Sequence, residues 1–496
     1  MKKLKYLLVL ILLVIPVMVL AEPPEKPPGD NGGSGGPGGQ PGGGSSSASY
    51  VGATTISSDT DLTSQTYTSS TGSENALLVS GGTSTLNTCT ITKTGDSSGD
   101  DSDFYGTNAA VLVYNGATLN ITGGNITTNG SHANAVFAYG TGIINISDTT
   151  IKTTSNNSGA IMVTGGGTLT ANNVTAETDG NSSAPIRSDR GGGTLTVNKG
   201  TYTSHGTGSP AIYSTANIIV NDAKLVSTSS EGVVVEGKNS VTLNNVTMEA
   251  TNTKLNSNSE TYKGIFIYQS MSGDAEVGTS SFTSKDSTIA NNKGDVIFVT
   301  NTNTVIELEN NTITNNDTEG NFLKIAAAKW GNSGSNGGTV TLKMINQDVT
   351  GDILVDSIST LALSLEGKSE LISAINNSNE AKEVTLSMSK NSVLSLTGNT
   401  YLTSLTNEDS TNSNIYSNGK YKLYVNGEEV TINSDTYSPK TEPDSDAKTE
   451  DEPVKKDSNN NLIYYIVGGS TLLVILVITI IVIFKKKGKR NAGTNI

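Results

Sequence analysis

Cysteine, histidine and aromatic residues are scarce in this sequence of 496 residues. The one cysteine, Cys89, cannot form an internal disulfide, so a large domain must rely on its own hydrogen-bonded core. Cys89 lies in a strand-like run at 86–91, which predicts a small buried or half-buried strand residue. The two histidines, His132 and His205, lie in separate loop-like stretches, and neither is assigned a role. With no cysteine or histidine cluster, the sequence gives no indication of a zinc site.

Basic residues are also outnumbered by acidic residues. The chain has 32 Lys and Arg residues against 46 Asp and Glu residues, a formal net charge of −14. The basic residues are scattered through the body of the chain. Because nucleic acid is recognised by clustered positive charge, this composition excludes it as an expected partner.

Long hydrophobic runs are confined to the two ends of the chain. Residues 1–21 combine a basic start, a short apolar run and a small residue at the end, which predicts a signal peptide. Residues 462–484 are apolar and long enough for a transmembrane helix, and the basic segment 485–496 that follows is expected to stay in the cytoplasm. No LPxTG-type sorting motif precedes this span. We therefore expect a single-pass protein of the cell membrane whose body is extracellular.

Two segments of low complexity enclose the body. Residues 22–49 are rich in Pro, Gly and Ser, which predicts a disordered linker, and residues 433–461 resemble a solvated acidic stalk. Between them, residues 50–432 consist of repeats.

Each repeat contains three short strand-like segments separated by turns. The best-marked segment is aliphatic at its second position and is followed by Gly-rich turn residues, an alternating strand, a tight turn and a third short strand. The repeats are too short for immunoglobulin-like domains, which need about seven strands per unit. The pattern predicts an all-β parallel β-helix, a solenoid of about thirteen rungs. The copies of the best-marked segment are at 110–114, 135–139, 160–164, 185–189, 211–215 and 232–236, with weaker copies at 264–268, 295–299, 321–325 and 352–356.

Asparagines mark the turn between the second and third strands. Asn172, Asn198, Asn221 and Asn244 take the same place in four successive repeats. Asparagine tolerates the left-handed backbone conformation that such a turn needs, and its amides can hydrogen-bond from rung to rung. In this respect residues 50–432 resemble the pectate-lyase-like family of right-handed parallel β-helices. The whole chain also resembles adhesin-like β-helix proteins of Gram-positive cell surfaces, with family-like runs at 209–215 and 267–273.

The first strand of each repeat has an outward face that is unusually apolar. Because strand side chains alternate, the third and fifth positions point away from the core. The third position reads Leu112, Phe137, Met162, Arg187, Tyr213, Val234, Phe266 and Ile297, and the fifth reads Tyr114, Tyr139, Thr164, Asp189, Thr215, Glu236, Tyr268 and Val299. Such a face indicates an interface or a ligand groove. The family resemblance implies that this sheet floors a carbohydrate cleft.

The candidate ligand-binding residues are taken from this face. Aromatic rings take up the apolar C–H surfaces of sugars, and charged groups fix their hydroxyls. The alternative is that loops fold over the face and make a second small core. The segments 94–108, 251–263 and 327–338, the last with Trp330, could be either covers or groove walls. The binding candidates are Phe137, Tyr139, Arg187, Asp189, Tyr213, Glu236, Phe266 and Tyr268.

A polar cluster midway along the face raises the possibility of catalysis. Asp189 and Glu236 share one column two rungs apart, near the upper end of the carboxylate separation in inverting glycoside hydrolases. Arg187 and Arg190 offer positive charge for acidic sugars or for a lyase. The catalytic motifs of the family's lyases and polygalacturonases are absent, and a surface salt-bridge network is the alternative.

One acidic loop suggests a cation. Asp96, Asp100, Asp101 and Asp103 are close in sequence, as in some calcium sites, although the spacing is not that of an EF-hand. A solvated acidic loop is the alternative.

We expect a monomer that binds an extracellular glycan or another surface ligand. The only cofactor that the sequence suggests is calcium. A polysaccharide lyase or glycoside hydrolase and a purely structural surface filament remain the alternatives.

Overall fold

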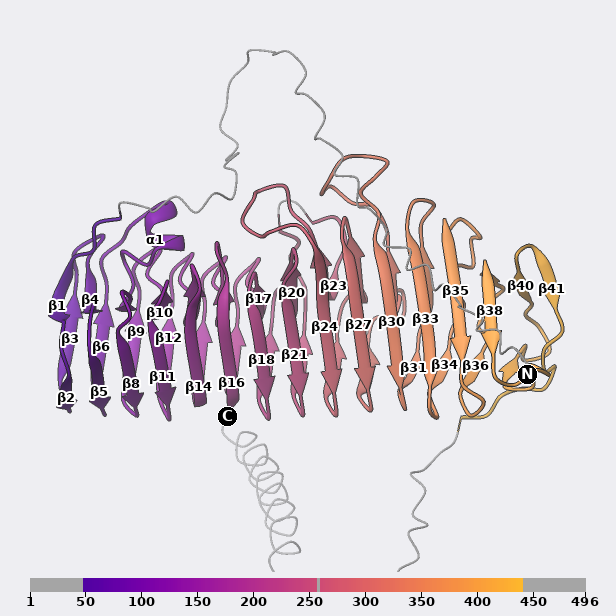
Figure 1. Ribbon diagram of the computed structural model, residues 1–496, viewed down its shortest axis with the longest axis horizontal. Helices are drawn as coiled ribbons and strands as arrows, with labels where there is room; N and C mark the ends of the chain where they lie inside the picture. The colour runs from indigo at the N-terminus through magenta and orange to yellow at the C-terminus, as the bar shows by residue number, and fades with distance from the viewer. Residues whose placement is uncertain (1–47, 257–258, 440–496) are drawn as a thin grey trace, which may run out of the picture. The chain divides into compact units, whose positions relative to one another are not determined.

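The structure is a computed structural model that describes residues 48–256 and 259–439. In that part the chain winds as an all-β, right-handed parallel β-helix, which confirms the predicted fold class. It has about 15 turns rather than the expected thirteen or so. The turns follow one another from β1 to β38 along the long axis of Figure 1. The described residues up to Tyr437 belong to one compact unit.

One wall of the β-helix is a 12-stranded parallel sheet made by the best-marked segment of each repeat. Its strands, in spatial order, are β1 (Gly52–Ile56), β4 (Asn75–Val79), β7 (Val111–Val113), β10 (Val136–Tyr139), β13 (Ile161–Thr164), β15 (Ile186–Ser188), β17 (Ile212–Ser214), β20 (Val233–Glu236), β23 (Lys263–Tyr268), β26 (Asp295–Thr300), β29 (Leu323–Ile325) and β32 (Ile353–Val355). This sheet carries every candidate binding residue named above except Asp189, which directly follows β15.

The other two walls form a 22-stranded sheet, because β14 and β16 run through both of them without a break. The second strands of the repeats are β2 (Thr60–Thr63), β5 (Thr83–Asn87), β8 (Thr118–Thr122), β11 (Ile143–Ser147), β14 (Gly167–Thr178), β16 (Gly193–Ser204), β18 (Asn217–Asn221), β21 (Ser240–Asn244), β24 (Thr279–Lys285), β27 (Asn303–Glu309), β30 (Thr339–Ile345), β33 (Thr360–Glu366), β35 (Glu383–Met388) and β38 (Ser404–Asn407). The third strands are β3 (Thr66–Ser69), β6 (Thr90–Lys93), β9 (Asn125–Thr128), β12 (Thr150–Thr153), β19 (Lys224–Ser227), β22 (Thr247–Ala250), β25 (Thr288–Asn291) and β28 (Thr312–Asn315).

The C-terminal turns are less regular. A 4-stranded parallel sheet contains β31 (Asp348–Thr350), β34 (Glu370–Ile372), β36 (Val393–Ser395) and β39 (Ile415–Tyr416), and a 3-stranded sheet contains β37 (Thr400–Leu402), β40 (Leu423–Val425) and β41 (Glu428–Val430). The pairing of β40 with β41 is antiparallel, whereas all other strand pairings of the described residues are parallel. Tyr437 packs on Tyr416 and its hydroxyl donates to Glu370, so the folded unit extends through this residue.

The core is a continuous column of aliphatic side chains inside the β-helix. Its members come from inward positions of all three walls, such as Ile186, Leu195 and Tyr202 within one turn. Cys89 is buried as expected, but it lies in the turn between β5 and β6 rather than in a strand. In most repeats the second and fourth positions of the best-marked segment face this core, as Val136 and Ala138 do in the copy at 135–139.

The predicted asparagine ladder is present. Asn198 Nδ2 donates to Asn172 Oδ1, Asn221 Nδ2 to Asn198 Oδ1 and Asn244 Nδ2 to Asn221 Oδ1, each at 2.9 Å. The left-handed residue of the turn is the next one along the chain, for example Asn173 with φ 53° and Asn245 with φ 52°. The ladder asparagines therefore act through their side-chain amides, and the residue after them supplies the backbone turn.

At one weaker repeat, the expected register was wrong by one residue. Ile265 pairs with Ile297, and Phe266 pairs with Phe298, so Phe298 and Thr300 point outward instead of Ile297 and Val299. The sequence was ambiguous here because Val296 and Ile297 are both aliphatic. A shift of one residue moves every side chain of a strand to the opposite face.

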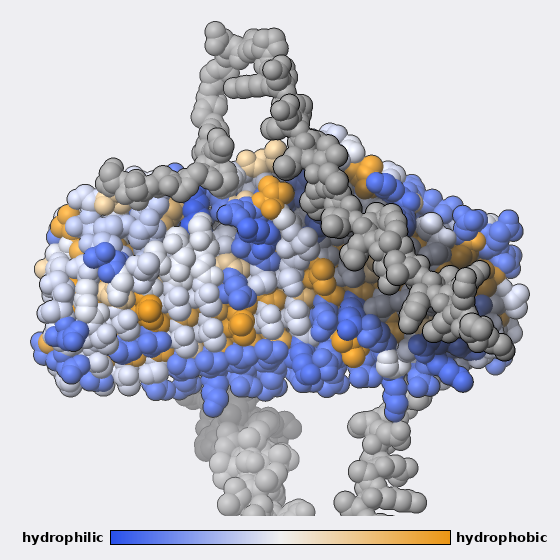
Figure 2. Space-filling view, in the orientation of Figure 1, coloured by the Kyte–Doolittle hydropathy of each residue, from blue (hydrophilic) through white to orange (hydrophobic). Residues whose placement is uncertain are grey.

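Segments that leave the β-helix gather at one border. Figure 1 shows α1 (Asp100–Phe104) and the longest connecting loops at the upper border. The opposite border, at the C-terminal ends of β18 and β21, is hydrophilic in Figure 2, while apolar residues on the visible face are scattered.

Several predicted segments lie outside the described residues. These are the signal peptide at 1–21, most of the 22–49 linker, most of the 433–461 stalk, the transmembrane helix at 462–484 and the basic tail at 485–496. Within 48–256 and 259–439, no helix is long and apolar enough to cross a membrane.

Candidate functional site

The outer face of the 12-stranded sheet is covered near its N-terminal end. Here an apolar group that we call the N-terminal outer cluster packs outside the main core. Phe137 and Met162 are fully buried in it, and Thr164 Oγ1 donates to the Phe104 carbonyl at 2.7 Å, which ties α1 to the sheet. The cluster consists of Leu78, Ala109, Leu112, Phe137 and Met162, with Tyr50, Tyr114 and Tyr139 packed against it. Phe137 is therefore a packing residue rather than an accessible ligand contact.

A second apolar group, the C-terminal outer cluster, lies further along the same face. Phe266 stacks between Tyr268 and Phe298, with ring centroids 4.4 Å and 5.6 Å away. Trp330 reaches over from the loop after β29, and its ring centroid is 5.2 Å from that of Tyr268. The cluster consists of Val234, Phe266, Tyr268, Phe298 and Ala326, with Tyr213, Ala328 and Trp330 packed against it. Loops thus cover both ends of the face.

Between the two clusters lies a cavity of about 350 Å³, which we call the outer cavity. Its floor is the outward face of β15, β17, β20 and β23, and its walls come from α1 and from loops before and after β23 and after β29. Loops therefore cover the two ends of the face, as the second-core alternative predicts, and a hollow remains between them. The residues that line the cavity are Phe104, Asn157, Ser182, Ala184, Arg187, Asp189, Gly208, Pro210, Tyr213, Glu231, Val234, Asn256, Ser259, Lys263, Phe266, Tyr268, Asp274 and Trp330.

Arg187 and Asp189 form a buried ion pair on the cavity floor. Arg187 Nη2 lies 3.1 Å from Asp189 Oδ2, and Nη1 donates to the Ser182 carbonyl at 3.3 Å. Burial raises the pKa of Asp189 to about 7, and Asp274 and Glu236 add to the rise while Arg187 opposes it. Asp189 is consequently a carboxyl group that can exchange a proton near neutral pH.

Arg190 holds two walls of the cavity together. Its Nε donates to Asp274 Oδ1 at 2.5 Å, and its Nη1 donates to Asp100 Oδ2 at 2.9 Å. The guanidinium also lies over the Phe104 ring, 3.8 Å from the centroid. Asp100 is on α1 and Asp274 is in the loop between β23 and β24. The Arg190 side chain thus joins α1, which precedes it in the sequence, to the loop after β23, which follows it.

Glu236, the other proposed catalytic carboxylate, is 1% exposed and does not line the cavity. Its Oε2 accepts from the Tyr268 hydroxyl at 2.8 Å and from the Tyr213 hydroxyl, and its Oε1 accepts from Ser270 Oγ. Burial raises the pKa of Glu236 above its usual range even though these three hydroxyls oppose the rise. Glu236 fixes the orientation of Tyr213 and Tyr268, which line the cavity, so it affects the cavity only through these two tyrosines.

Lys263 and Glu231 form a second buried pair in the cavity. Lys263 Nζ lies 3.1 Å from Glu231 Oε1, and it also donates to the Thr261 carbonyl at 3.1 Å and to Ser259 Oγ. The ammonium is 4.4 Å from the centroid of the Phe266 ring. The outward-face pattern did not point to this pair, because Glu231 precedes its strand and Lys263 begins one. No sequence signal identifies their partnership.

The four aspartates suggested for calcium do not form one site. Asp96 Oδ1 accepts from the Ser131 amide, Asp100 pairs with Arg190, and Asp103 Oδ1 lies 2.7 Å from His132 Nδ1. Asp100 and Asp103 are three residues apart in α1 and so lie on one side of the helix, but each is held by a partner of its own, Arg190 and His132. The acidic run instead starts a short helix and supplies contacts that hold it in place.

Another group of side chains in the described part could hold a metal ion. Candidate ligand atoms of Glu177, Asp179 and His205 lie within 4.8 Å of one another. However, Lys152 Nζ lies 2.7 Å from both Glu177 Oε1 and Asp179 Oδ1. The Lys152 ammonium already lies between the two carboxylates, where a metal ion would bind. We therefore interpret this group as an ion-pair network.

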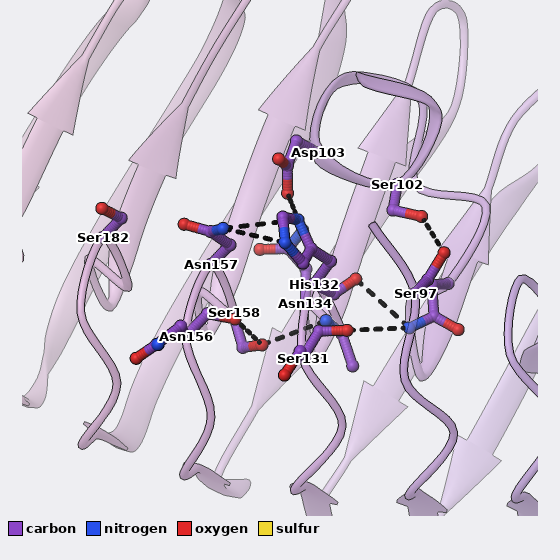
Figure 3. Close-up of polar contacts among 12 residues, drawn as sticks. Ser97, Ser102, Asp103, Ser131, His132, Asn134, Asn156, Asn157, Ser158 and Ser182 are labelled. Carbon is purple, nitrogen blue, oxygen red and sulfur yellow. Dashed lines mark hydrogen bonds and ion pairs between the residues drawn. The ribbon is translucent and has the colours of Figure 1, made fainter. Parts of the chain in front are cut away.

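The contact between His132 and Asp103 belongs to a polar network beneath α1, shown in Figure 3. His132 Nε2 also accepts from Asn157 Nδ2 at 3.0 Å, and Ser102 Oγ donates to Ser97 Oγ at 2.8 Å. His132, Asn157 and Ser182 take the same corner in successive turns, with φ of 55°, 54° and 52°. The corner geometry places the imidazole under the helix, where it anchors Asp103.

A second, larger groove of about 570 Å³ lies beyond the loop that follows β23. The residues that line it are Gln269, Val277, Gly278, Asn301, Thr302, Asn303, Gly334, Ser335, Gly337, Thr339, Ser357, Ile358 and Lys382. Apart from Lys382 its polar lining is uncharged, and no aromatic residue takes part in it. The outer cavity is therefore the hollow in which aromatic and charged groups meet.

No known protein family, no curated protein and no solved structure matches this chain. The case for a function rests on the geometry of the site.

Proposed function

We propose that this chain is an adhesin-like surface protein that binds carbohydrate in the outer cavity. The supporting observation is that aromatic rings and hydrogen-bonding groups face one hollow. Tyr213, Phe266, Tyr268 and Trp330 contribute apolar faces, and Arg187 and Asp189 contribute polar groups. Sugars present both kinds of surface, since their C–H faces are apolar and their rims carry hydroxyls.

The size of the cavity supports a small ligand or the end of a longer one. At about 350 Å³ it is near the lower end of the range of about 300–1,000 Å³ that is typical of small-molecule sites. Such a volume suits a few sugar rings rather than a long polymer segment.

The proposed location at the cell surface is consistent with this role. The sequence of 1–21 supports export, and that of 462–484 followed by 485–496 supports a single membrane anchor with the β-helix outside. A β-helix displayed in this way would meet extracellular glycans directly.

Trp330 provides the test. We expect the full-length chain to bind a subset of oligosaccharides on a glycan array, and Trp330→Ala to weaken that binding about two- to tenfold, since an aromatic contact contributes about 0.5–1.5 kcal/mol beyond its area. Tyr401→Ala is the matched control, because Tyr401 stacks on Tyr424 far from the cavity, among the C-terminal strands. Equal binding by the wild type and Trp330→Ala would argue against the cavity as the site.

The second candidate function, cleavage of a polysaccharide, is favoured by the raised pKa of Asp189. Asp189 and Asp274 both line the cavity, and Asp274 contributes to that rise. Two carboxyl groups that line one cavity can divide the roles of general acid and base. A reducing-end assay tests this: activity should be lost in both Asp189→Asn and Asp274→Asn. Activity that survives both changes would exclude this pair.

A further inference from the structure

We propose that the outer cavity selects uncharged sugars, because each charged side chain that lines it is already neutralised by a partner within the protein. This inference rests on the proposed carbohydrate-binding function and names the class of ligand. It runs against the expectation that the arginines on this face would attract acidic sugars.

The ammonium of Lys263 has no hydrogen-bond donor left for a ligand. Its three N–H groups are matched by Glu231 Oε1, the Thr261 carbonyl and Ser259 Oγ. The Lys263 side chain is 1% exposed. The other carboxylate oxygen of Glu231 accepts from Ser230 Oγ at 2.5 Å. Both members of the pair are therefore satisfied before a ligand arrives.

The remaining charges are paired in the same way. Arg187 is held by Asp189 Oδ2, and the other oxygen of Asp189 accepts from the Arg190 amide at 3.1 Å. Asp274 is held by Arg190, whose guanidinium is shared with Asp100 and packs on Phe104. The two cations of the lining, Arg187 and Lys263, face the three carboxyl groups of Asp189, Glu231 and Asp274, with Arg190 as the third cation behind them. Each of these three cations is thus paired with a carboxylate inside the protein.

A charged ligand would have to break one of these pairs or leave its own charge unmatched. Removing one partner of a buried pair leaves an uncompensated charge in a poorly solvated place, which is strongly unfavourable. A hydroxyl group has no such requirement, because it can share hydrogen bonds with groups that remain paired. The aromatic rings then supply the apolar contact that neutral sugars need.

The experiment compares ligands that differ only in charge. The full-length chain is titrated with neutral oligosaccharides, with the same oligosaccharides oxidised to uronates and with their amino-sugar counterparts. We expect the neutral members to bind about tenfold or more tightly than either charged series, since the charged ligands lack a compensating partner. Tighter binding of a charged series than of its neutral parent would overturn the inference and leave the proposed function standing.

Two variants that each unmask one charge sharpen the result. Glu231→Gln leaves Lys263 without its carboxylate and should improve the binding of uronates relative to neutral sugars. Lys263→Met leaves Glu231 unmatched and should improve the binding of amino sugars. Glu309→Gln is the control, since it breaks the exposed Lys285–Glu309 pair between β24 and β27 and should change no preference. An unchanged preference in both cavity variants, checked to be folded by circular dichroism, would contradict the charge-pair explanation.

The outcomes separate the two proposals. If no sugar of any charge binds, the proposed function fails, and the inference fails with it. If sugars bind without regard to charge, the function stands and the inference alone is wrong.

Discussion

At the scale of single residues, Asp189 gives the strongest indication that the outer cavity is a functional site and not only a gap in the packing. The residue is 4% exposed, its carboxyl group pairs with Arg187, and burial raises its pKa to about 7. An ordinary stabilising aspartate has a pKa below its value in water, because it accepts hydrogen bonds or lies beside a cation in a solvated place. Burial outweighs the arginine here, so the site retains a group that costs stability when ionised. Such groups are concentrated at functional sites.

The raised pKa of Asp189 predicts how the free energy of unfolding depends on pH. It lies above the value of 3.8 for the exposed group, so the folded state holds the proton more tightly than the unfolded state does. That contribution is complete below pH 3.8 and is lost as the pH rises through about 7. We expect the free energy of unfolding to fall by roughly 2–3 kcal/mol from pH 5 to pH 8 on account of this group. Asp189→Asn should remove that part of the slope in denaturant titrations.

Glu236 titrates in the same direction, because burial raises its pKa also. The difference between the wild type and Asp189→Asn isolates Asp189 from it. Parallel pH profiles for the two proteins would show that Asp189 is ionised throughout the range.

Phe137 serves as a structural reference for the aromatic face. Because it is fully buried beneath α1, Phe137→Ala should leave a cavity and cost about 3–5 kcal/mol of stability. Trp330 is only half-buried at the edge of the outer cavity, so Trp330→Ala should cost much less. Melting temperatures compare the two directly. Equal losses would mean that Trp330 is as much a core residue as Phe137.

At the scale of elements, α1 and the loop after β23 depend on each other through Arg190. The contacts span 90 residues to Asp100 and 84 residues to Asp274. Since the pairs are partly exposed, each contributes about 0–1 kcal/mol, too little to decide the fold but enough to bias the position of a loop. The two cavity walls are thus coupled through Arg190.

Arg190→Met tests this coupling. We expect faster amide hydrogen exchange both in α1 and in the segment 270–278, with little change in the melting temperature of the β-helix. Lys285→Met is the control, because it also removes one lysine or arginine charge from an ion pair but lies away from both segments. Faster exchange in only one of the two segments would refute the idea of a shared clamp.

How far the sequence predicts these elements depends on the range of the interactions. The β-helix was predictable because its evidence is local and repeated, as in the inward aliphatic column and the ladder from Asn172 to Asn244. The residues Arg187, Asp189, Tyr213, Phe266 and Tyr268 were found because alternation places them on one face, and the structure brings all five to the cavity. The ligand role of these residues stays a prediction.

Other features were not accessible from the pattern. The roof over Phe137 and the pairing of Arg190 with Asp274 depend on loop conformations that carry no periodicity. Likewise, the slip at Ile297 arose because two neighbouring aliphatic residues fit the inward position equally well, and only pairing with Ile265 decides between them.

At the scale of the whole molecule, about 15 turns give a long scaffold, with the outer cavity about midway along the 12-stranded sheet. At about 4.8 Å per turn the described unit is roughly 70 Å long. Such a scaffold can present a site at a distance from its point of attachment, in keeping with the proposed membrane anchor at 462–484. The monomeric state stays a prediction.

The central claim is that a neutral glycan occupies the outer cavity, and a structure of the complex tests it most directly. Crystals of the protein with its tightest-binding neutral oligosaccharide should show a sugar ring against Tyr268 and Trp330, with hydroxyls near Arg187 and Asp189. The Arg187–Asp189 and Lys263–Glu231 pairs should remain intact in that complex. Sugar density in the polar groove beside Asn301 and Lys382, with the outer cavity unchanged, would contradict the account.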